Sequence, residues 1–302
     1  MRKLFQWDLG TRKLELGQRT LLMGIVNVTP DSFSDGGLHL DPTQAFEHAM
    51  RLLDEGADVV DIGGESTRPG TMATVSAEVE MARVLPVIRR LKQARPDAIV
   101  SVDTYKASVA RAAVEIGAEI VNDVSGGTWD PEMLATLSRL PCGFVLMHMR
   151  GRPGEWRSLP SIGDALGVVR QHLAQRAQEA SKHVSPARIV LDPGFGFGKS
   201  FEENYPLVSH FATLSELGFP LLGGVSRKSF IGRMLASGRQ DAPLGNRLLG
   251  TLVVETALVL KGAHILRTHD VRASHDVVRV ADAILQANHL EPENMDHENM
   301  DR

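Results

Sequence analysis

Residues that can bind polar or charged groups stand at the ends of eight short apolar segments of this 302-residue chain. They are carboxylates, amides, a hydroxyl and cations: Asn27, Asp61, Asp103, Asn122, His148, Asp192, Ser226 with Lys228, and Arg267 with His269. Unlike charges that leave water together are costly unless they pair or bind something. If these side chains converge on one area, most of them should face a ligand.

The glycine-rich stretch "LDPGFGFGKS" (191–200) suggests phosphate binding, but its spacing excludes two common nucleotide loops. A P-loop, G-x-x-x-x-G-K-[ST], would need a glycine where this chain has Pro193, which has no N–H to offer. The dinucleotide pattern G-x-G-x-x-G fails because the glycines stand at 194, 196 and 198. We therefore predict a turn that glycine makes easily, directly after Asp192.

Short apolar runs alternate with amphipathic segments along most of the chain. The runs are branched and bounded by Gly, Pro or polar residues, as buried parallel strands are, and they cover 21–28, 58–64, 98–103, 119–125, 143–149, 188–194, 220–226 and 264–270. Helices are predicted at 41–56, 76–94, 106–117, 130–140, 161–183, 201–218, around 245–262 and 271–287. Eight strand–helix units predict an α/β fold, a (β/α)₈ TIM barrel, preceded by a β-hairpin. A doubly wound open sheet shows the same alternation and remains the alternative.

The polar run ends must gather at one mouth of such a barrel, because parallel strands place their carboxyl ends at the same edge. Side chains two residues apart on a strand share a face. Two pairs are related in this way: Arg267 with His269, and Ser226 with Lys228. By the same rule His148 points away from the cavity if Met147 and Met149 line it, so we interpret His148 as structural.

Composition and charge exclude several classes of protein. The chain is 43% hydrophobic and 23% charged with a net charge of −4, so no basic field attracts nucleic acid or an anionic membrane. No apolar run reaches the roughly 18 residues of a membrane-spanning helix, and no signal peptide is recognised. The single cysteine suits a reducing compartment, so we expect a cytoplasmic protein. Residues 1–290 are predicted to form one domain and the polar residues 291–302 a disordered tail.

Two long loops follow the first two predicted strands, at 27–42 and 63–76. Both are rich in Gly, Pro, Ser, Thr and Asp and have no apolar periodicity. Loops of this length in a compact domain are usually active-site covers or linkers, and a linker has no place at this point of a barrel. We therefore predict that both loops are lids over the mouth.

The strand ends and these loops together resemble dihydropteroate synthase of the folate pathway, a family of pterin-binding barrels. Eight stretches in one order carry the resemblance: "MGIVNVTPDSFSDGG" (23–37), "DIGGESTRPG" (61–70), "SVDTYK" (101–106), "VND" (121–123), "LMHM" (146–149), "LDPGFGFGK" (191–199), "GVSRKSFIG" (224–232) and "RTHDV" (267–271). The resemblance implies one barrel whose bottom is closed by the hairpin, in a homodimer. It also implies that 6-hydroxymethyl-7,8-dihydropterin diphosphate and 4-aminobenzoate condense to 7,8-dihydropteroate and pyrophosphate, assisted by Mg²⁺.

The resemblance assigns residues of this chain to the parts of the site. The pterin is expected on Asp103, Asn122, Asp192, Lys228 and Met147, and 4-aminobenzoate on Thr67, Arg68, Pro69, Ser226, Phe197 and Phe33. The diphosphate is expected on Asn27, Arg267 and His269, with Asn27 as the Mg²⁺ ligand. The expected catalytic residues are Lys228, Arg267, His269 and Asp103. Lys228 is also expected to compensate the charge of Asp192.

We expect a dissociative, SN1-like path, in which a cation forms at the exocyclic CH₂ of the pterin as pyrophosphate departs. Two alternatives to the synthase stay open. A barrel that binds reduced pterin for methyl transfer to a corrinoid would share the pterin residues, although no corrinoid domain is encoded here. An inactive pterin-binding relative would keep the fold without turnover.

Overall fold

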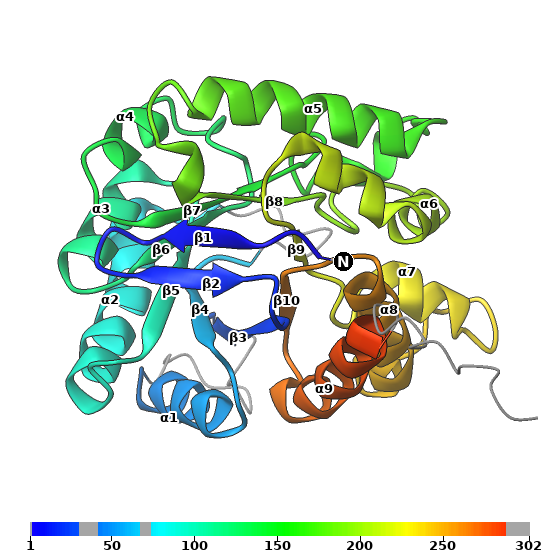
Figure 1. Ribbon diagram of the computed structural model, residues 1–302. Coiled ribbons are helices and arrows are strands. Elements are labelled where there is room, and N and C mark those ends of the chain that lie inside the picture. Colours follow the sequence, from blue (N-terminus) through cyan, green and yellow to red (C-terminus); the bar gives the residue numbers. More distant parts are fainter. Residues whose placement is uncertain (1, 30–41, 67–73, 288–302) are drawn as a thin grey trace, which may run out of the picture.

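Eight parallel strands form a ring in the computed structural model, which describes residues 2–29, 42–66 and 74–287 (Figure 1). The strands are β3 Leu21–Asn27, β4 Val59–Gly63, β5 Ile99–Asp103, β6 Ile120–Asp123, β7 Gly143–Met147, β8 Ile189–Asp192, β9 Leu222–Gly223 and β10 Ile265–Thr268. They pair in the order β8-β7-β6-β5-β4-β3-β10-β9. A parallel bridge between Leu191 and Leu221 joins β8 to the segment before β9. The ring is therefore closed, which confirms the barrel and excludes the open sheet.

Helices cover the outside of the ring, as the alternating sequence predicts. They are α1 Pro42–Asp54, α2 Ala77–Ala94, α3 Ala107–Glu115, α4 Met133–Leu137, α5 Ala165–Ala180, α6 Asn204–Ser209, α7 Ser229–Met234, α8 Leu248–Leu260 and α9 Val271–Ala287. Short 3₁₀ turns occupy Trp156–Ser158, Pro186–Arg188, Phe211–Leu217 and Leu244–Arg247. Within the part of the chain that the structure describes, none of the helices is long and apolar enough to cross a bilayer.

The predicted helix at 201–218 is wrong as a single element, because the structure divides it into α6 and the 3₁₀ turn Phe211–Leu217. The helix predicted at 130–140 is reduced to α4, and Asp130, which precedes it, contacts the backbone of two segments. One carboxylate oxygen of Asp130 accepts a hydrogen bond from the Glu132 N–H at 2.9 Å, and the other accepts one from the Ala107 N–H at 2.8 Å. Asp130 thus satisfies a free N–H at the start of α3.

The barrel strands bury both faces, and period-two alternation divides their side chains between two cores. On β3, Leu22 and Val26 point outward into the core under the helices, whereas Leu21 and Met23 point into the barrel. The inner core also contains Val59, Ile120, Val145, Val190, Leu222 and Ile265 from six other strands. The lower part of the barrel is therefore a packed apolar layer.

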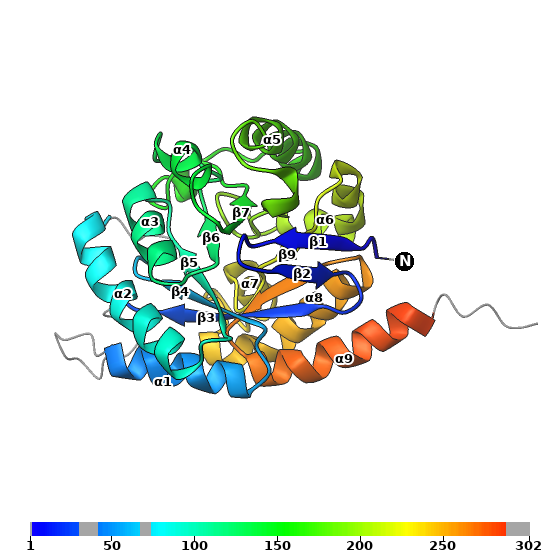
Figure 2. The same ribbon diagram turned by 60° about the vertical axis from the view of Figure 1, so that its left-hand side comes forward.

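An antiparallel hairpin, β1 Phe5–Asp8 with β2 Lys13–Leu16, lies across the bottom of the ring (Figure 2). Its Trp7, Leu9 and Leu16 join the inner core. The Trp7 indole N–H donates to the Arg188 carbonyl at 2.8 Å, which fixes the hairpin to the barrel. The predicted hairpin and its place at the bottom are confirmed, so the open mouth of the barrel is at the opposite end.

Candidate active site

A cavity of about 410 Å³ lies at the carboxyl end of the strands. Strand and loop residues line it together: Ile25, Asn27, Thr29, Glu65, Ser66, Asp103, Trp156, Gly196, Phe197, Gly224, Ser226, Arg227, Lys228, Ser229, Leu244, Arg247, Arg267 and His269. The predicted pairs Arg267 with His269 and Ser226 with Lys228 both face this cavity. The period-two argument is confirmed for Arg267 and His269, because the intervening Thr268 does not line the cavity, whereas Arg227 lines it together with Ser226 and Lys228, beyond the end of β9.

The inner face of several strands changes from apolar to polar toward the mouth. On β10 the inward residue Ile265 is followed two positions later by Arg267. On β3 the inward residues Leu21 and Met23 are followed by Ile25 and Asn27, which line the cavity. The site residues are thus the next inward positions above the apolar layer, and the fold requires them to converge.

The Arg267 guanidinium bridges two carboxylates from different strands. Its Nε donates to Asp61 Oδ2 at 2.6 Å and one Nη donates to Asp103 Oδ2 at 2.7 Å. The Asn122 amide donates to the same Asp61 oxygen at 3.0 Å. Burial alone would lower the pKa of Arg267, but its two carboxylate partners outweigh this, and the pKa rises. Asp61 has no role in the sequence-based site, and the structure assigns it one: it holds Arg267 in place.

Asp103 has a shifted acidity. Burial raises the pKa of its carboxyl, and the nearby Arg267 charge offsets only part of that effect, so the pKa is about 7. A carboxyl group with this pKa exchanges its proton near neutral pH. It is therefore suited to hydrogen bonding with a ligand whose N–H pattern or charge changes during a reaction.

Asp192 ends β8 and is not itself among the residues that line the cavity, but it lies next to Gly224, which is, and the glycine turn that the sequence predicts follows it. The Gly194 N–H donates to Asp192 Oδ1 at 2.7 Å, and burial raises the pKa of this carboxyl. Gly194 has φ +66°, and a Cβ there would stand 1.9 Å from the His148 carbonyl oxygen. The turn therefore requires glycine in order to direct Asp192, as expected.

Lys199 of the same stretch does not present its ammonium group to the cavity. Its Nζ donates to the Gly194 carbonyl at 2.6 Å and to the Phe197 carbonyl at 3.3 Å. Burial lowers the pKa of Lys199 to about 7. The lysine thus closes the glycine turn from within, which confirms that the stretch is not a phosphate loop of the P-loop type.

The predicted compensation between Lys228 and Asp192 is confirmed as an attraction that shifts the pKa of both groups, without a direct ion pair between them. The Lys228 ammonium lies 3.8 Å from the centroid of the Phe197 ring, and it is not within ion-pair distance of any carboxylate in the described ranges. Burial lowers the pKa of Lys228 to about 7; repulsion by Arg267 adds to this, and attraction by Asp192 and Asp103 opposes it. Lys228 is therefore a buried cation held over an aromatic face and available to an acceptor on a ligand.

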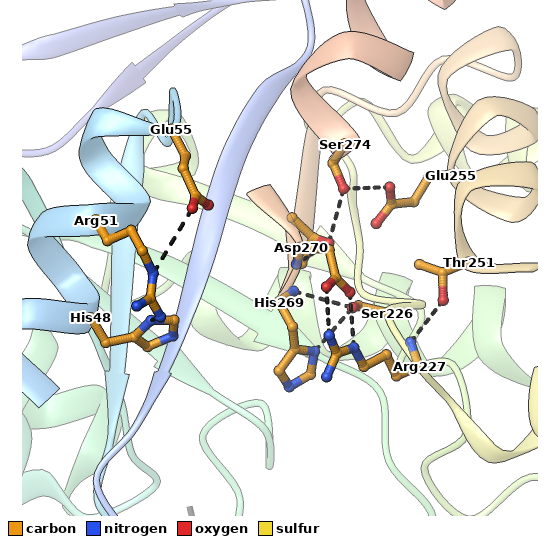
Figure 3. A network of polar contacts seen from close by, with 11 residues as sticks. His48, Arg51, Glu55, Ser226, Arg227, Thr251, Glu255, His269, Asp270 and Ser274 are labelled. Atoms are coloured by element: carbon orange, nitrogen blue, oxygen red, sulfur yellow. Dashed lines mark hydrogen bonds and ion pairs between the residues drawn. The ribbon is translucent and has the colours of Figure 1, made fainter. Parts of the chain in front are cut away.

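Ser226 is engaged by His269, as Figure 3 shows. The Ser226 Oγ lies 2.9 Å from His269 Nδ1, and it also accepts a hydrogen bond from the His269 backbone N–H at 3.1 Å. The next residue, Arg227, has φ 56° and forms an ion pair with Asp270. Two loops that carry cavity residues are therefore tied together, and the expected contact of Ser226 with 4-aminobenzoate stays a prediction.

A buried polar network lies behind β10 and connects it to α8 and α9 (Figure 3). The Ser274 hydroxyl of α9 donates to Glu255 of α8 at 2.7 Å and lies 3.0 Å from the Thr268 hydroxyl of β10. Burial raises the pKa of Glu255 to about 7. The strand that carries Arg267 is therefore fixed from outside the barrel as well as from within.

His148 and Met147 lie on opposite faces of β7, as interpreted from the sequence. His148 is buried against His172 of α5 with ring centroids 4.7 Å apart, and burial lowers its pKa to about 2. Met147 instead packs with Val124 and Phe197 in a small apolar cluster at the mouth. The structural interpretation of His148 is confirmed, and the contact of Met147 with a pterin stays a prediction.

The described residues of the two predicted lids, 27–42 and 63–76, include residues that line the cavity. Thr29 of the first loop lines it, and so do Glu65 and Ser66 of the second. Four predicted contacts of 4-aminobenzoate lie outside the described residues: Phe33, Thr67, Arg68 and Pro69.

Two neighbouring side chains hold the Glu65 carboxylate in place. It accepts hydrogen bonds from the Tyr105 hydroxyl and the Lys106 ammonium, and Lys106 also pairs with Glu80 of α2. The wall of the cavity at this point is therefore anchored to two other elements, and the sequence analysis did not find this contact. The sequence signal that could have indicated this contact is the pair Tyr105 and Lys106, which follows the next strand and can reach the Glu65 carboxylate.

Comparison with known proteins agrees with this geometry. The model of the family described as "Pterin binding enzyme" matches residues 23–269. Dihydropteroate synthase of Synechocystis sp. is 43% identical over 277 residues, covering 91% of this chain and 94% of that protein. The Xanthomonas albilineans synthase solved with 4-aminobenzoic acid superposes with a TM-score of 0.84 at 42% identity, covering 96% of this chain and 100% of that one. The Xanthomonas albilineans synthase in complex with 7,8-dihydropteroate superposes with a TM-score of 0.80 at 40% identity, covering 95% of this chain and 100% of that one. This chain belongs to the pterin binding enzymes and, among them, to the dihydropteroate synthases.

Proposed function

We propose that this protein is an active dihydropteroate synthase, which joins 6-hydroxymethyl-7,8-dihydropterin diphosphate to 4-aminobenzoate. The observation that carries the proposal is the convergence of Asp103, Lys228, Arg267 and His269 on one cavity, with Asp192 next to Gly224 of its lining. That cavity combines acids for the N–H edge of a pterin with cations for a diphosphate. The related synthases cover more than nine-tenths of the chain, which favours this reaction over methyl transfer to a corrinoid.

The pterin ring occupies the strand-end side of the cavity. Asp192 accepts the paired N–H groups of the pterin's guanidine-like edge, because its Oδ1 is already directed by the Gly194 N–H. Asp103 and Asn122 complete this end, and both are held through the Arg267–Asp61 contacts. Lys228 donates to the ring acceptors, and Met147 contributes an apolar surface beside Phe197.

The diphosphate lies toward Arg267 and His269, which share one face of the chain at the end of β10. Pyrophosphate gains charge as it departs, and prearranged cations stabilise that charge without moving. The two carboxylate partners keep the Arg267 guanidinium in one orientation, and Ser226 does the same for the His269 ring. The site therefore needs little reorganisation during bond breaking.

Magnesium fits this end of the cavity through Asn27. The Asn27 side chain lines the cavity, and its neutral amide oxygen suits a cation that keeps several waters and takes oxygens from substrate phosphates. Bound Mg²⁺ would offset charge on the diphosphate.

Removal of divalent metal by a chelator should suppress turnover, and Asn27→Ala should raise the Mg²⁺ concentration needed for half-maximal rate. An unchanged Mg²⁺ requirement in that variant would exclude Asn27 as the ligand.

The second substrate, 4-aminobenzoate, enters above the pterin. Phe197 lines this part of the cavity, and Ser226 lies at its side. Phe33, Thr67, Arg68 and Pro69 complete the proposed binding set from outside the described residues. The amine of 4-aminobenzoate then lies next to the exocyclic CH₂ of the pterin, in the position needed for attack.

The reaction follows a dissociative path. The bond between the exocyclic CH₂ and the diphosphate oxygen breaks, and its electron pair leaves with pyrophosphate. Electron release from the dihydropterin ring stabilises the resulting carbocation, and the amine then forms the C–N bond and loses a proton. Exclusion of water protects the cation, which is the role proposed for the two lids. A rate of bond breaking that follows the nucleophilicity of substituted aryl amines would argue against this path.

Pyrophosphate release, measured with and without 4-aminobenzoate, tests the proposed function. We expect release together with formation of 7,8-dihydropteroate when both substrates and Mg²⁺ are present. Methyl transfer from a reduced methylpterin to a corrinoid, without pyrophosphate release, would support the methyltransferase alternative. Binding of the pterin substrate without any product would identify an inactive relative.

The pH dependence of kcat/KM for the pterin substrate should be bell-shaped, with its maximum near neutrality. Asp103 has a raised pKa of about 7 and binds the pterin as the carboxylate, so the rate rises as pH passes that value. Lys228 has a lowered pKa of about 7 and acts as the ammonium, so the rate falls as its proton is lost. Asp103→Asn should remove the rising limb and retain the falling one. A rising limb that persists in this variant would assign it to another group.

A homodimer is supported by an exposed apolar face on α8 and α9, which lie side by side (Figures 1 and 2). Leu249 and Val253 stand one turn apart on α8 and are 76% and 69% exposed, and Val280 and Ile284 are arranged in the same way on α9. Val253→Glu should therefore convert the dimer to monomer in sedimentation measurements. Val168→Glu, at an exposed apolar position of α5, is the matched control and should not change the mass. A parent protein that sediments as a monomer would refute the proposal.

The cytoplasm remains the expected compartment. Cys142 is the chain's single cysteine, and it is buried and free. Burial raises the pKa of its thiol to about 11, so the thiol is unreactive in the folded protein. Fractionation of cells that produce the protein would test this location.

A further inference from the structure

An aromatic side chain that the sequence-based site does not include forms part of the cavity wall. Trp156 opens the 3₁₀ turn Trp156–Ser158 in the segment between β7 and α5, and it lines the cavity. The segment follows the Met147 end of β7, on the side of the barrel where loops rise above the strand ends. Trp156 therefore lies on the loop side of the cavity, whereas Asp192 ends a barrel strand and lies next to Gly224 of the lining.

Trp156 contacts Phe197, the aromatic side chain over which the Lys228 ammonium lies. The rings of Trp156 and Phe197 are 5.4 Å apart at 81°, an edge-to-face arrangement. The Lys228 ammonium lies 3.8 Å from the centroid of the same Phe197 ring. Phe197 is thus held between an indole and a cation, and the position of Trp156 helps to determine where the Phe197 ring lies.

The segment that carries Trp156 is fixed to the loop that carries Phe197. The Arg150 guanidinium donates to the Gly198 carbonyl at 3.2 Å and to the Pro160 carbonyl at 3.0 Å. At the other end of the segment, the Ser161 hydroxyl donates to Glu203 at 2.8 Å. Both ends are therefore pinned to the segment after β8, so the indole is positioned before a ligand arrives.

The Trp156 indole N–H is shielded from solvent and has no hydrogen-bond partner among the described residues. A buried donor without a partner is unfavourable, and the great majority of such groups are satisfied in folded proteins. The surrounding contacts therefore hold Trp156 in place although its indole N–H forms no stabilising hydrogen bond there. An arrangement of this kind is expected where a side chain serves a ligand rather than stability.

We infer that Trp156 is a specificity-determining residue for the second substrate, providing the flat wall against which the ring of an aryl amine packs. This inference rests on the proposed function, because it takes the strand-end side of the cavity as the pterin site and the loop side as the aryl amine site. The cavity that Trp156 lines is also lined by Glu65 and Ser66, so a planar ring that enters it can pack against the indole with polar side chains in the same cavity. The wall also limits the width of the ring that can enter.

Steady-state kinetics of Trp156→Ala test the inference. The KM for 4-aminobenzoate should rise about tenfold through loss of the aromatic contact, and the KM for the pterin diphosphate should change less than about twofold. Discrimination should also relax, so that kcat/KM for the wider 4-amino-1-naphthoate increases relative to 4-aminobenzoate. Trp156→Phe should restore most of the affinity for 4-aminobenzoate, because it keeps an aromatic surface.

Trp129 offers a matched control in the same aromatic cluster. Its ring packs edge-to-face with Tyr105, with ring centroids 4.9 Å apart, and the Arg152 guanidinium lies over it, but Trp129 is not among the residues that line the cavity. Trp129→Ala should leave the KM for 4-aminobenzoate and the naphthoate ratio unchanged. Equal effects of the two alanine substitutions would reduce Trp156 to general packing and overturn the inference, as would an equal rise in both substrates' KM values for Trp156→Ala.

Fluorescence gives a readout that does not depend on turnover. The chain has three tryptophans, and Trp7 is buried under the barrel, so Trp129→Phe leaves Trp156 as the cavity reporter. Addition of 4-aminobenzoate with pyrophosphate to this variant should quench its emission, and the quench should be absent in Trp156→Phe. No quench in an active Trp129→Phe enzyme would overturn the inference alone. An unmodified protein that forms no dihydropteroate would instead overturn the proposed function.

Discussion

Replacing Arg267 by Met should reduce turnover by on the order of 10³-fold and destabilise the fold by about 3–5 kcal/mol. Arg267 bonds to Asp61 at 2.6 Å and to Asp103 at 2.7 Å, and both carboxylates are removed from water. Without the guanidinium, two like charges remain close together with no cation between them, which is why the stability loss is large. Urea unfolding and pyrophosphate release on the same preparation measure the two effects.

Two further variants separate the structural and catalytic contributions of Arg267. The double variant Asp61→Asn with Arg267→Met removes one of the unpaired acids, so it should recover much of the stability while remaining inactive. Arg267→Lys keeps the charge but cannot form the two-armed contact, so we expect partial stability and a rate well below that of the parent. A double variant that regains both stability and turnover would show that Arg267 is only a structural counter-ion.

Much of this site follows from the order of residues along the strands. Polar residues end the apolar runs, and parallel strands bring those ends together, so the convergence of Asp103, Lys228 and Arg267 was predictable. The spacing of two between Arg267 and His269 was also sufficient to place both in the cavity. Strand periodicity is a local property, which is why the sequence reveals it.

The choice of partners within the ring was not predictable in the same way. The sequence-based interpretation placed Lys228 near Asp192 so that their charges compensate, but it did not find the cross-strand contact of Arg267 with Asp61 and Asp103. β10 pairs with β3, and the long Arg267 side chain reaches past it to β4 and β5. Which acid lies within reach depends on the stagger and curvature of the barrel, and neither leaves a pattern in the sequence.

Short and irregular segments account for the other omissions. α7 has only six residues, too few for a helical period to be visible, so the sequence analysis did not predict it. The segment that carries Trp156 forms only a three-residue 3₁₀ turn and is held by side-chain contacts with residues near 200. Such positions are specified by tertiary contacts rather than by local propensity.

Replacing Lys228 by Met should abolish most activity while making the protein more stable. The Lys228 ammonium lies over the Phe197 ring without a carboxylate partner in the described ranges, and burial lowers its pKa from 10.5 to about 7. Each tenfold change in proton affinity corresponds to about 1.4 kcal/mol, so holding this cation in the folded state costs a few kcal/mol. Met keeps the aliphatic stem and removes the charge, so a gain of roughly 1–3 kcal/mol is expected.

The pH dependence of this gain identifies its cause. The pKa of Lys228 in the folded protein lies below its pKa in the unfolded chain. The stability cost of burying the ammonium is therefore fully present below about pH 7 and disappears as the pH rises toward 10.5. The stability difference between Lys228→Met and the parent should therefore be largest at acidic to neutral pH and shrink at alkaline pH. Urea unfolding across this range measures it, and a difference that is constant with pH would point to packing instead.

The activity loss should accompany the stability gain, because the same unpaired ammonium is the donor to the pterin. We expect kcat/KM for the pterin diphosphate to fall by at least about 10²-fold in Lys228→Met, and the residual rate to lack the falling limb near pH 7. Lys228→Arg should keep a donor and a charge that does not titrate, so its residual rate should persist at alkaline pH. A Lys228→Met enzyme that is stabilised yet fully active would show that the cost of burying this lysine serves some purpose other than pterin binding.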